Sequence, residues 1–250
     1  MTTTDRPFLL PAAVLAIGIA VGVAVGGLLA GHGIVRAKAA DRYVTVKGVS
    51  EREARADLAI WPLRLVASDN DLARANAQLQ QAVGRIKAFL AANRVDTTQI
   101  TLQDFVVRDA QANSLGGGPN FGPRYVINQT LLVRSTEPEV VLAASQRVSA
   151  LVAQGVPLTS GAEYGGGGPT FVFTGLNALK PAMIAEATAR AREAAAQFAR
   201  DAGSALGGIR QANQGYFEIL PRDQAQGISE SSQVRKTIRV VATVEYLLDD

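Results

Sequence analysis

The hydrophobic pattern begins with an unbroken apolar stretch near the amino terminus. No charged residue occurs between Pro7 and Val35. Phe8 to Ala30 alone corresponds to a helix about 34 Å long, which is enough to span a bilayer core of roughly 30 Å. Residues 1–39 are therefore predicted to be a transmembrane anchor or an export signal.

The residues that flank this segment are compatible with three locations for the domain that follows it. A retained anchor places the following domain in the periplasm, whereas cleavage at Ala37-Lys38-Ala39, which resembles a signal-peptidase site, releases the domain there. The charges of Arg36, Lys38 and Arg42 favour the reverse topology instead. Because long domains translocate largely regardless of flanking charge, we expect a single-pass inner-membrane protein with a periplasmic domain, and a free periplasmic domain as the alternative.

Glycine recurs at every fourth position of the apolar segment, at Gly18, Gly22 and Gly26. Residues four apart share one face of a helix, and glycines on that face let two helix backbones approach closely. The pattern thus predicts a packing face for a second copy of the helix within the lipid bilayer. The simpler interpretation is that apolar leaders are commonly rich in glycine and alanine.

Residues 42–248 alternate between strand and helix patterns. Alternating apolar and polar positions predict strands, whereas apolar positions three and four apart predict helices. The predicted strands cover 42–49, 58–68, 98–108, 124–135, 156–175, 208–220 and 235–248, and the predicted helices cover 68–93, 136–153 and 181–202.

Local features refine these predictions. Pro62 lacks an amide hydrogen, which favours a sheet edge or a bulge, and the neighbouring Trp61 is expected to pack in the core. The charged residues 50–57 predict a turn. The alanine-rich third helix is predicted to lie close to a sheet on Met183, Ile184, Ala187, Ala191, Ala194, Ala195, Phe198 and Ala202. The expected helix boundaries are a cap at Ser68, Asp69 or Asn70 and stops at Asn93, Gly155 and Gly203.

The order of these elements is β-β-α-β-β followed by α-β-α-β-β. This order predicts an α+β fold in which a largely antiparallel sheet carries helices packed on it. Each half contains a β-α-β-β unit, so we predict two pseudo-repeated units within one domain, residues 42–248, preceded by the N-terminal transmembrane helix.

The amino-acid composition excludes several kinds of catalytic and metal site. The chain has no cysteine and a single histidine, His32, at the end of the apolar segment. Residues 42–248 therefore cannot supply a Ser-His-Asp triad, a catalytic thiolate or a zinc site of His or Cys ligands. The carboxylate pairs Glu51/Glu53 and Asp69/Asp71 are explained by solvation and helix capping. We expect no catalytic residue, no cofactor and no metal.

The charge distribution and two glycine-rich segments indicate which binding partners to expect. Most of the net charge of +3 lies beside the apolar leader, so nucleic acid is not expected as a partner. Two glycine-rich segments, 116–122 and 164–171, are either slack connectors or a rim that captures a peptide or small ligand.

Three segments resemble the SIMPL-domain family, a group of bacterial periplasmic and envelope proteins. "VTVKGVSEREARADLAI" contains the family's usual glycine and aspartate at Gly48 and Asp57, and "RVDTTQITLQDF" and "AMIAEATARAREAAAQFARDAGSALGGI" match a turn and an alanine-rich helix. Three residues depart from the family pattern: Ser50, Ala56 and Arg94 stand where a second glycine, a proline and a glycine are common. The resemblance implies an exported or envelope-anchored protein that oligomerises and is associated with envelope or oxidative stress, without an established active site.

Two functional hypotheses follow. The first is a non-enzymatic, membrane-tethered periplasmic envelope protein that self-assembles into a homo-oligomer. The second is a periplasmic binding module that captures a peptide or small ligand through its glycine-rich loops.

Overall fold

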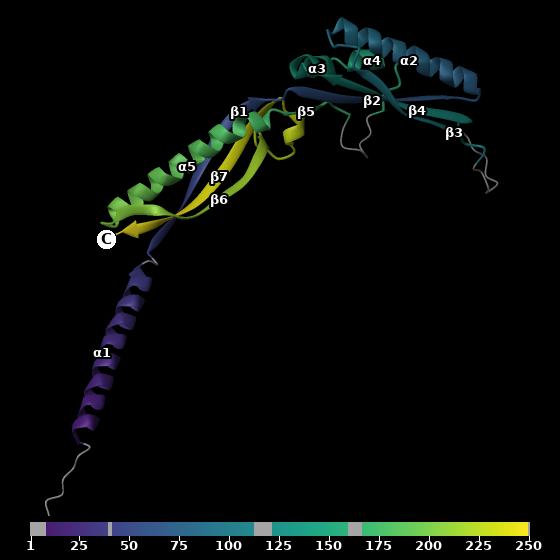
Figure 1. Cartoon of the computed structure of the whole chain (residues 1–250). Helices are drawn as coiled ribbons and strands as arrows, with labels where there is room; N and C mark the ends of the chain where they lie inside the picture. The colour runs from purple at the N-terminus through teal and green to yellow at the C-terminus, as the bar shows by residue number, and fades with distance from the viewer. Residues whose placement is uncertain (1–8, 40–41, 113–121, 160–166, 250) are drawn as a thin grey trace, which may run out of the picture. The chain divides into compact units, whose positions relative to one another are not determined.

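A computed structural model describes residues 9–39, 42–112, 122–159 and 167–249 of the chain. It contains an N-terminal apolar helix followed by a mixture of helices and antiparallel strands, as the sequence predicts (Figure 1). The helix, α1, covers Leu9–Ala39. Its segment Val14–His32 has a mean hydropathy of 2.4, is not buried by any other part of the chain, and is long enough to cross a membrane.

The chain divides into two compact units. The first unit contains residues up to Val49, Ile184–Gly215 and the chain from Val241 onward, and the second contains Ser50–Met183 and Tyr216–Val240. Four elements contribute residues to both units. They are β1 (Tyr43–Arg55), α5 (Leu176–Asp201), β6 (Ala205–Pro221) and β7 (Arg235–Asp249), and the three strands form a sheet in the order β1-β7-β6.

The first unit has a thin core between α5 and the strands, and Figure 1 shows α5 along one face of them. Gly48 of β1 lies against the helix so closely that a Cβ atom there would be 1.8 Å from the carbonyl oxygen of Ala187. Small side chains on the helix make this approach possible. The buried core residues are Val46, Ala191, Ala195, Val244 and Tyr246.

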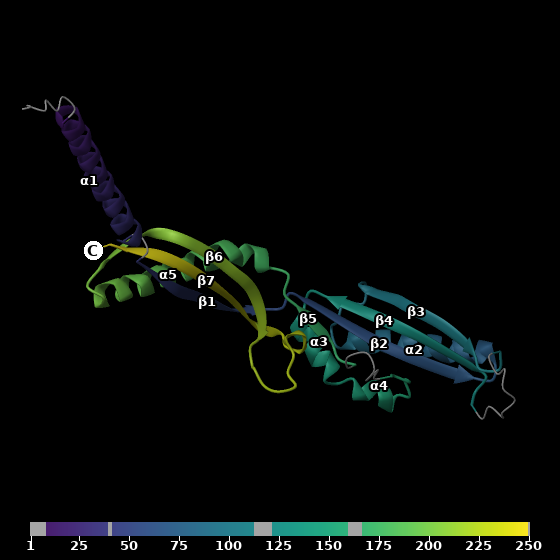
Figure 2. The ribbon, with the colours of Figure 1, turned by 90° about the horizontal axis from the view of Figure 1, so that it is seen from below.

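The second unit is built on a four-stranded sheet of order β3-β4-β2-β5 whose three strand pairings are antiparallel. Its helices lie on one face of the sheet, and the strands are in front of α2 in Figure 2. Trp61, Leu65, Ile86 and Leu131 are among its core residues. The elements are β2 (Leu58–Asp69), α2 (Leu72–Ala92), β3 (Ile100–Asp109), β4 (Tyr125–Ser135), α3 (Pro138–Ser145), α4 (Ser149–Ala153) and β5 (Thr170–Val172).

The turn predicted over 50–57 is reduced to the junction at 56–57, because β1 continues as a strand to Arg55 and β2 begins at Leu58. The charged side chains of β1 occupy exposed strand positions, and the two glutamates pair with neighbouring cations. Glu51 lies 3.3 Å from the Arg239 guanidinium, and Glu53 lies 3.9 Å from that of Arg222. Both faces of β1 are exposed over residues 51–53, and the charged residues there do not mark the end of the strand.

Helix boundaries were predicted in part. Asn93, Gly155 and Gly203 end helices as expected, and both glycines have positive φ angles, 76° and 68°. The α2 cap is Asp71, whose side chain accepts a hydrogen bond from the Arg74 amide, and not one of residues 68–70. The helix predicted over 136–153 is broken into α3 and α4.

Pro62 lies in a regular part of β2, paired with Leu132 without a register shift, so the predicted bulge is wrong. On the other edge of β2, the described pairings are β5 at residues 58–60 and an isolated bridge to Leu158 at Leu65. Pro62 falls between them, where no amide hydrogen is required. Trp61 is buried as predicted, and its indole donates to the Gly167 carbonyl at 3.4 Å.

The third predicted helix is confirmed, but its apolar stripe is narrower than expected. Met183, Ala187, Ala191 and Ala195 are buried, whereas Phe198 is 59% exposed and Ala202 also lies on the surface. The strand predicted over 156–175 is reduced to β5 and the bridge at Leu158 within the described residues. The two predicted pseudo-repeated units are not confirmed. One sheet has three strands in the order β1-β7-β6, whereas the other has four in the order β3-β4-β2-β5.

Candidate functional site

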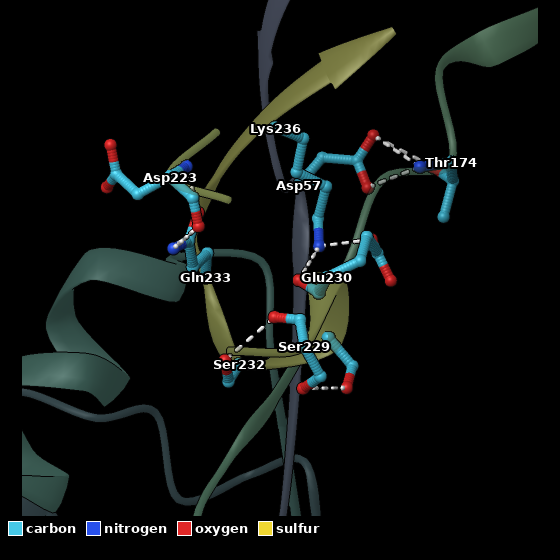
Figure 3. Close-up of polar contacts among 9 residues, drawn as sticks. Asp57, Thr174, Asp223, Ser229, Glu230, Ser232, Gln233 and Lys236 are labelled. Atoms are coloured by element: carbon cyan, nitrogen blue, oxygen red, sulfur yellow. Dashed lines mark hydrogen bonds and ion pairs between the residues drawn. The ribbon is translucent and has the colours of Figure 1, made fainter. Parts of the chain in front are cut away.

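A set of polar contacts joins the β1–β2 junction to two distant segments of the second unit. The Asp57 carboxylate accepts hydrogen bonds from the Thr174 amide at 2.9 Å and from the Thr174 hydroxyl at 3.0 Å (Figure 3). The amides of Ala56 and Asp57 donate to the carbonyls of Val234 and Val172. The junction is therefore held between the end of β5 and the start of β7.

Lys236 in β7 is the most unusual charged residue of this region, because its side chain is completely buried. Its ammonium group donates to the carbonyl oxygen of Glu230 at 2.8 Å and to the Glu230 carboxylate (Figure 3). A buried ammonium is tolerated only with such partners. The pair thus fixes the short 3-10 helix Glu230–Ser232, which precedes β7.

Further hydrogen bonds close the loop between β6 and β7. The side-chain amide of Gln233 accepts from the Asp223 amide at 3.1 Å and donates to the Asp223 carbonyl at 3.2 Å. Within the loop, the Ser232 hydroxyl donates to the Ser229 carbonyl at 2.8 Å (Figure 3). These contacts all tie the loop to itself, so the cluster holds the backbone in place.

A different kind of site lies at the end of the four-stranded sheet, where β3 is the terminal strand. Nearly all of its residues are exposed, including the apolar Leu102, Phe105, Val106 and Val107, which are 42–54% exposed. Leu102 and Val107 are opposite the buried Leu131 and Ile127 of β4, and yet remain open to solvent. The core therefore ends at β4 and leaves both faces of β3 accessible.

The interior of β3 contains a bulge. Gln103 pairs with Thr130 and Val106 with Asn128, so β3 has one extra residue between these pairs. Asp104 within the bulge has a φ of 54°. Bulges are one of the devices that protect sheet edges from unwanted pairing, and here the bulge interrupts the strand before its most apolar part.

Comparison with known proteins gives the family. The family model named SIMPL, described as a protein of unknown function (DUF541), matches residues 44–246, which is most of the chain. The chain belongs to the SIMPL family. No curated protein matches it. The two residues that carry the resemblance have clear physical roles in this SIMPL domain: Gly48 permits close packing of α5, and Asp57 binds the chain after β5.

The structure describes only some of the residues for which the sequence predicts a functional role. Gly18, Gly22 and Gly26 lie in α1 with open space around each, so helix packing on them stays a prediction. Residues 116–121 and 164–166 of the glycine-rich segments lie outside the described residues. The Nδ1 atom of His32 lies 3.1 Å from the Leu28 carbonyl oxygen within α1, where that oxygen is the acceptor. Among the residues that the structure describes, no three His, Cys, Asp or Glu side chains gather as metal ligands.

The sequence analysis explained the carboxylate pairs Glu51/Glu53 and Asp69/Asp71 by solvation and helix capping, and their contacts in the SIMPL domain agree with that explanation. Glu51 and Glu53 form surface ion pairs, Asp71 caps α2, and Asp69 binds the Arg74 guanidinium at 2.9 Å. The hydrogen bond from Arg74 lowers the pKa of Asp69. The sequence did not reveal the Lys236–Glu230 pair, although Lys236 shares the strand face of Ile238 and Val240, which was a signal that it would be buried.

Acid should weaken the β3–β4 connection of the SIMPL domain. The Arg124 guanidinium, 3.1 Å from Asp109, lowers the pKa of that carboxyl. A lowered folded-state pKa contributes stability above the unfolded value of about 3.9, and this is lost as pH falls through the folded-state pKa. We expect Asp109→Asn to lower the thermal midpoint at pH 7, and the difference from the unmodified chain to disappear once the pH falls below the lowered pKa of Asp109.

The matched control is Asp223→Asn, because the Asp223 side chain is exposed and its contacts in the loop use backbone atoms. Its thermal midpoint should follow that of the unmodified chain at every pH. A constant difference between Asp109→Asn and the unmodified chain across the acid range would show that the ion pair does not contribute in this way.

Proposed function

We propose that this SIMPL protein is a non-enzymatic, membrane-tethered periplasmic envelope protein whose domain self-assembles through β3. The observation that carries the proposal is the exposure of four large apolar side chains, Leu102, Phe105, Val106 and Val107, on a terminal strand. An exposed apolar edge strand offers unpaired backbone groups together with surface that gains by leaving water.

The tether supports the same proposal. None of the apolar segment Val14–His32 of α1 is buried by other described residues, which suits burial in lipid. Anchoring confines copies of the domain to one plane and raises their effective concentration, so that a modest interface is sufficient for assembly. The signal-like sequence at the end of α1 leaves a released periplasmic form as the alternative location.

The full-length chain should therefore have two measurable properties. A reporter enzyme that is active only outside the cytosol, fused to the carboxyl end, should be active in cells. The chain extracted in mild detergent should have a protein mass of a dimer or larger by light scattering. Replacing Phe105 and Val107 together by lysine should reduce that mass to a monomer, since both side chains are exposed and their loss leaves the core intact.

Two controls identify the source of assembly. Tyr216→Lys removes an aromatic side chain that is 94% exposed on β6 and should leave the mass unchanged. Gly22→Ile blocks close packing along α1 and should also leave it unchanged if the domain drives assembly. A monomer for the unmodified chain, or a reporter active only in the cytosol, contradicts the proposal. Loss of assembly in Gly22→Ile alone would assign it to the anchor instead.

A further inference from the structure

We infer that β3 pairs antiparallel with β3 of a second copy of the chain, in the register that places Val106 opposite Val106. This inference deepens the proposed self-assembly and rests on it. Antiparallel pairing of identical strands about a twofold axis gives the same surface from each copy, which is the usual geometry of a closed dimer. It also covers the exposed edge of both sheets at once.

Charge complementarity fixes the register. Asp104 and Arg108 lie two positions before and two positions after Val106. Centred on Val106, antiparallel pairing places each Asp104 opposite the Arg108 of the other copy, and this happens twice across the axis. Within the described part of the chain, neither side chain has an ion-pair partner.

The apolar residues fit the same register. Phe105 lies opposite Val107 of the second copy, and aromatic with β-branched residues is a favourable cross-strand pair. A shift by one residue in one direction places Asp104 opposite Asp109, which sets like charges against each other. A shift in the other direction places Arg108 opposite Gln103 and leaves both charges unpaired. Of these three registers, only the one centred on Val106 satisfies the charged and the apolar positions together.

The bulge limits the length of the pairing. Because the extra residue lies between Gln103 and Val106, the regular part of the outer edge begins close to Phe105. Regular pairing is therefore confined to 105–107, and Asp104, whose φ of 54° places it in the bulge, meets Arg108 of the second copy at the end of that segment. A short interface of this kind is reversible, and its occupancy depends on the concentration of the domain at the membrane.

Cysteine crosslinking of the full-length chain tests the register directly, since the protein has no cysteine of its own. Opposite residues of antiparallel strands have Cα atoms about 4.5–5.5 Å apart, which is within the range that a disulfide spans. Under mild oxidation in detergent, Val106→Cys should form a disulfide-linked dimer. A mixture of Phe105→Cys and Val107→Cys should form the mixed dimer. Thr101→Cys is the control and should stay monomeric, because its counterpart is about 33 Å away along the strand.

A charge exchange provides a second measurement. Arg108→Asp and Asp104→Arg should each weaken dimerisation roughly tenfold, because each places like charges opposite each other. The double variant D104R/R108D should restore the affinity of the unmodified chain. Equal crosslinking along the whole strand, which indicates parallel pairing, a maximum at another position, or no rescue by the double variant overturns the register.

These outcomes separate the two proposals. If the unmodified chain is monomeric at every concentration, self-assembly itself is wrong. If the chain is oligomeric but the Val106→Cys variant does not crosslink, assembly stands and the pairing of β3 is wrong. If Val106→Cys is captured by a different envelope protein and not by its own copy, the second-copy assignment is wrong.

Discussion

Replacing Gly48 by alanine is expected to unfold or severely destabilise the first unit. The added Cβ atom would lie 1.8 Å from the Ala187 carbonyl oxygen and 2.6 Å from the Ala191 amide nitrogen, far inside van der Waals contact. Both neighbours are backbone atoms of α5, so no side chain can rotate away. The helix must move off the sheet or the strand must bend.

The cost of this displacement is large because the core it disturbs is thin. Beyond Val46, Val244 and Tyr246, the first unit is packed with the small side chains of Ala191 and Ala195. Forcing extra volume into a packed core costs about 1–3 kcal/mol and occasionally more. With rigid backbone on the receiving side, we expect about 3 kcal/mol or more. Urea denaturation of the full-length chain in detergent, followed by circular dichroism, measures the loss.

Gly208→Ala is the matched control, since Gly208 also lies in a strand of the first unit but a Cβ atom there meets no atom within 4 Å. Its denaturation midpoint should differ little from that of the unmodified chain. Gly84→Ala in α2 should be neutral or stabilising by up to about 1 kcal/mol, as expected for glycine in an open helix position. A Gly48→Ala midpoint equal to these controls would show that α5 does not pack on β1 as described.

The elements that the sequence predicted well have a strong internal period. The apolar residues of α2 that recur at three- and four-residue spacing from Ala75 to Leu90 are buried, and the alternating residues of β7 are buried from Ile238 to Tyr246. In both cases one face meets a core and the other meets water. Arg94 is a related case, because its φ of 63° explains why a glycine is common there in the family.

The elements that the sequence predicted poorly depend on contacts between distant residues. Residues 50–55 read as a turn because they are charged, but Arg239 and Arg222 satisfy Glu51 and Glu53 along the strand. Phe198 reads as a core residue by spacing, yet α5 buries only the narrower stripe around Ala191. Local patterns cannot specify which strand or helix lies opposite.

The candidate site shows the same limit. The run Phe105-Val106-Val107 was predicted as a strand, and consecutive apolar residues place such side chains on both faces. That β3 would be terminal, with neither face covered, follows only from the strand order. The spacing of Asp104 and Arg108 is visible in the sequence. It can pair two copies of the chain only if the strand that carries both residues lies at an exposed sheet edge.

Removing the carboxylate of Glu230 is the second change with a large expected effect. In Glu230→Ala, the ammonium of the fully buried Lys236 would keep only the backbone carbonyl of residue 230 as a partner. Breaking a buried ion pair from one side typically costs about 3–5 kcal/mol, because a desolvated charge is left without its counter-charge. The Glu230 side chain is 34% exposed, so water can reach this side and we expect the lower end of that range. Urea denaturation midpoints measure the loss.

Lys236→Met should be milder than Glu230→Ala, since methionine fills much of the same buried volume without a charge, and the partly exposed Glu230 remains solvated. The double variant with Glu230→Ala and Lys236→Met should therefore be more stable than Glu230→Ala alone. Independent losses would instead add and make the double variant less stable. Glu218→Ala, which removes an exposed carboxylate from β6, should change stability by less than about 0.5 kcal/mol. If Glu230→Ala is no more destabilising than Glu218→Ala, Lys236 reaches water or another anion in solution. The loop before β7 would then be held by the hydrogen bonds between Gln233 and Asp223 rather than by the buried ion pair.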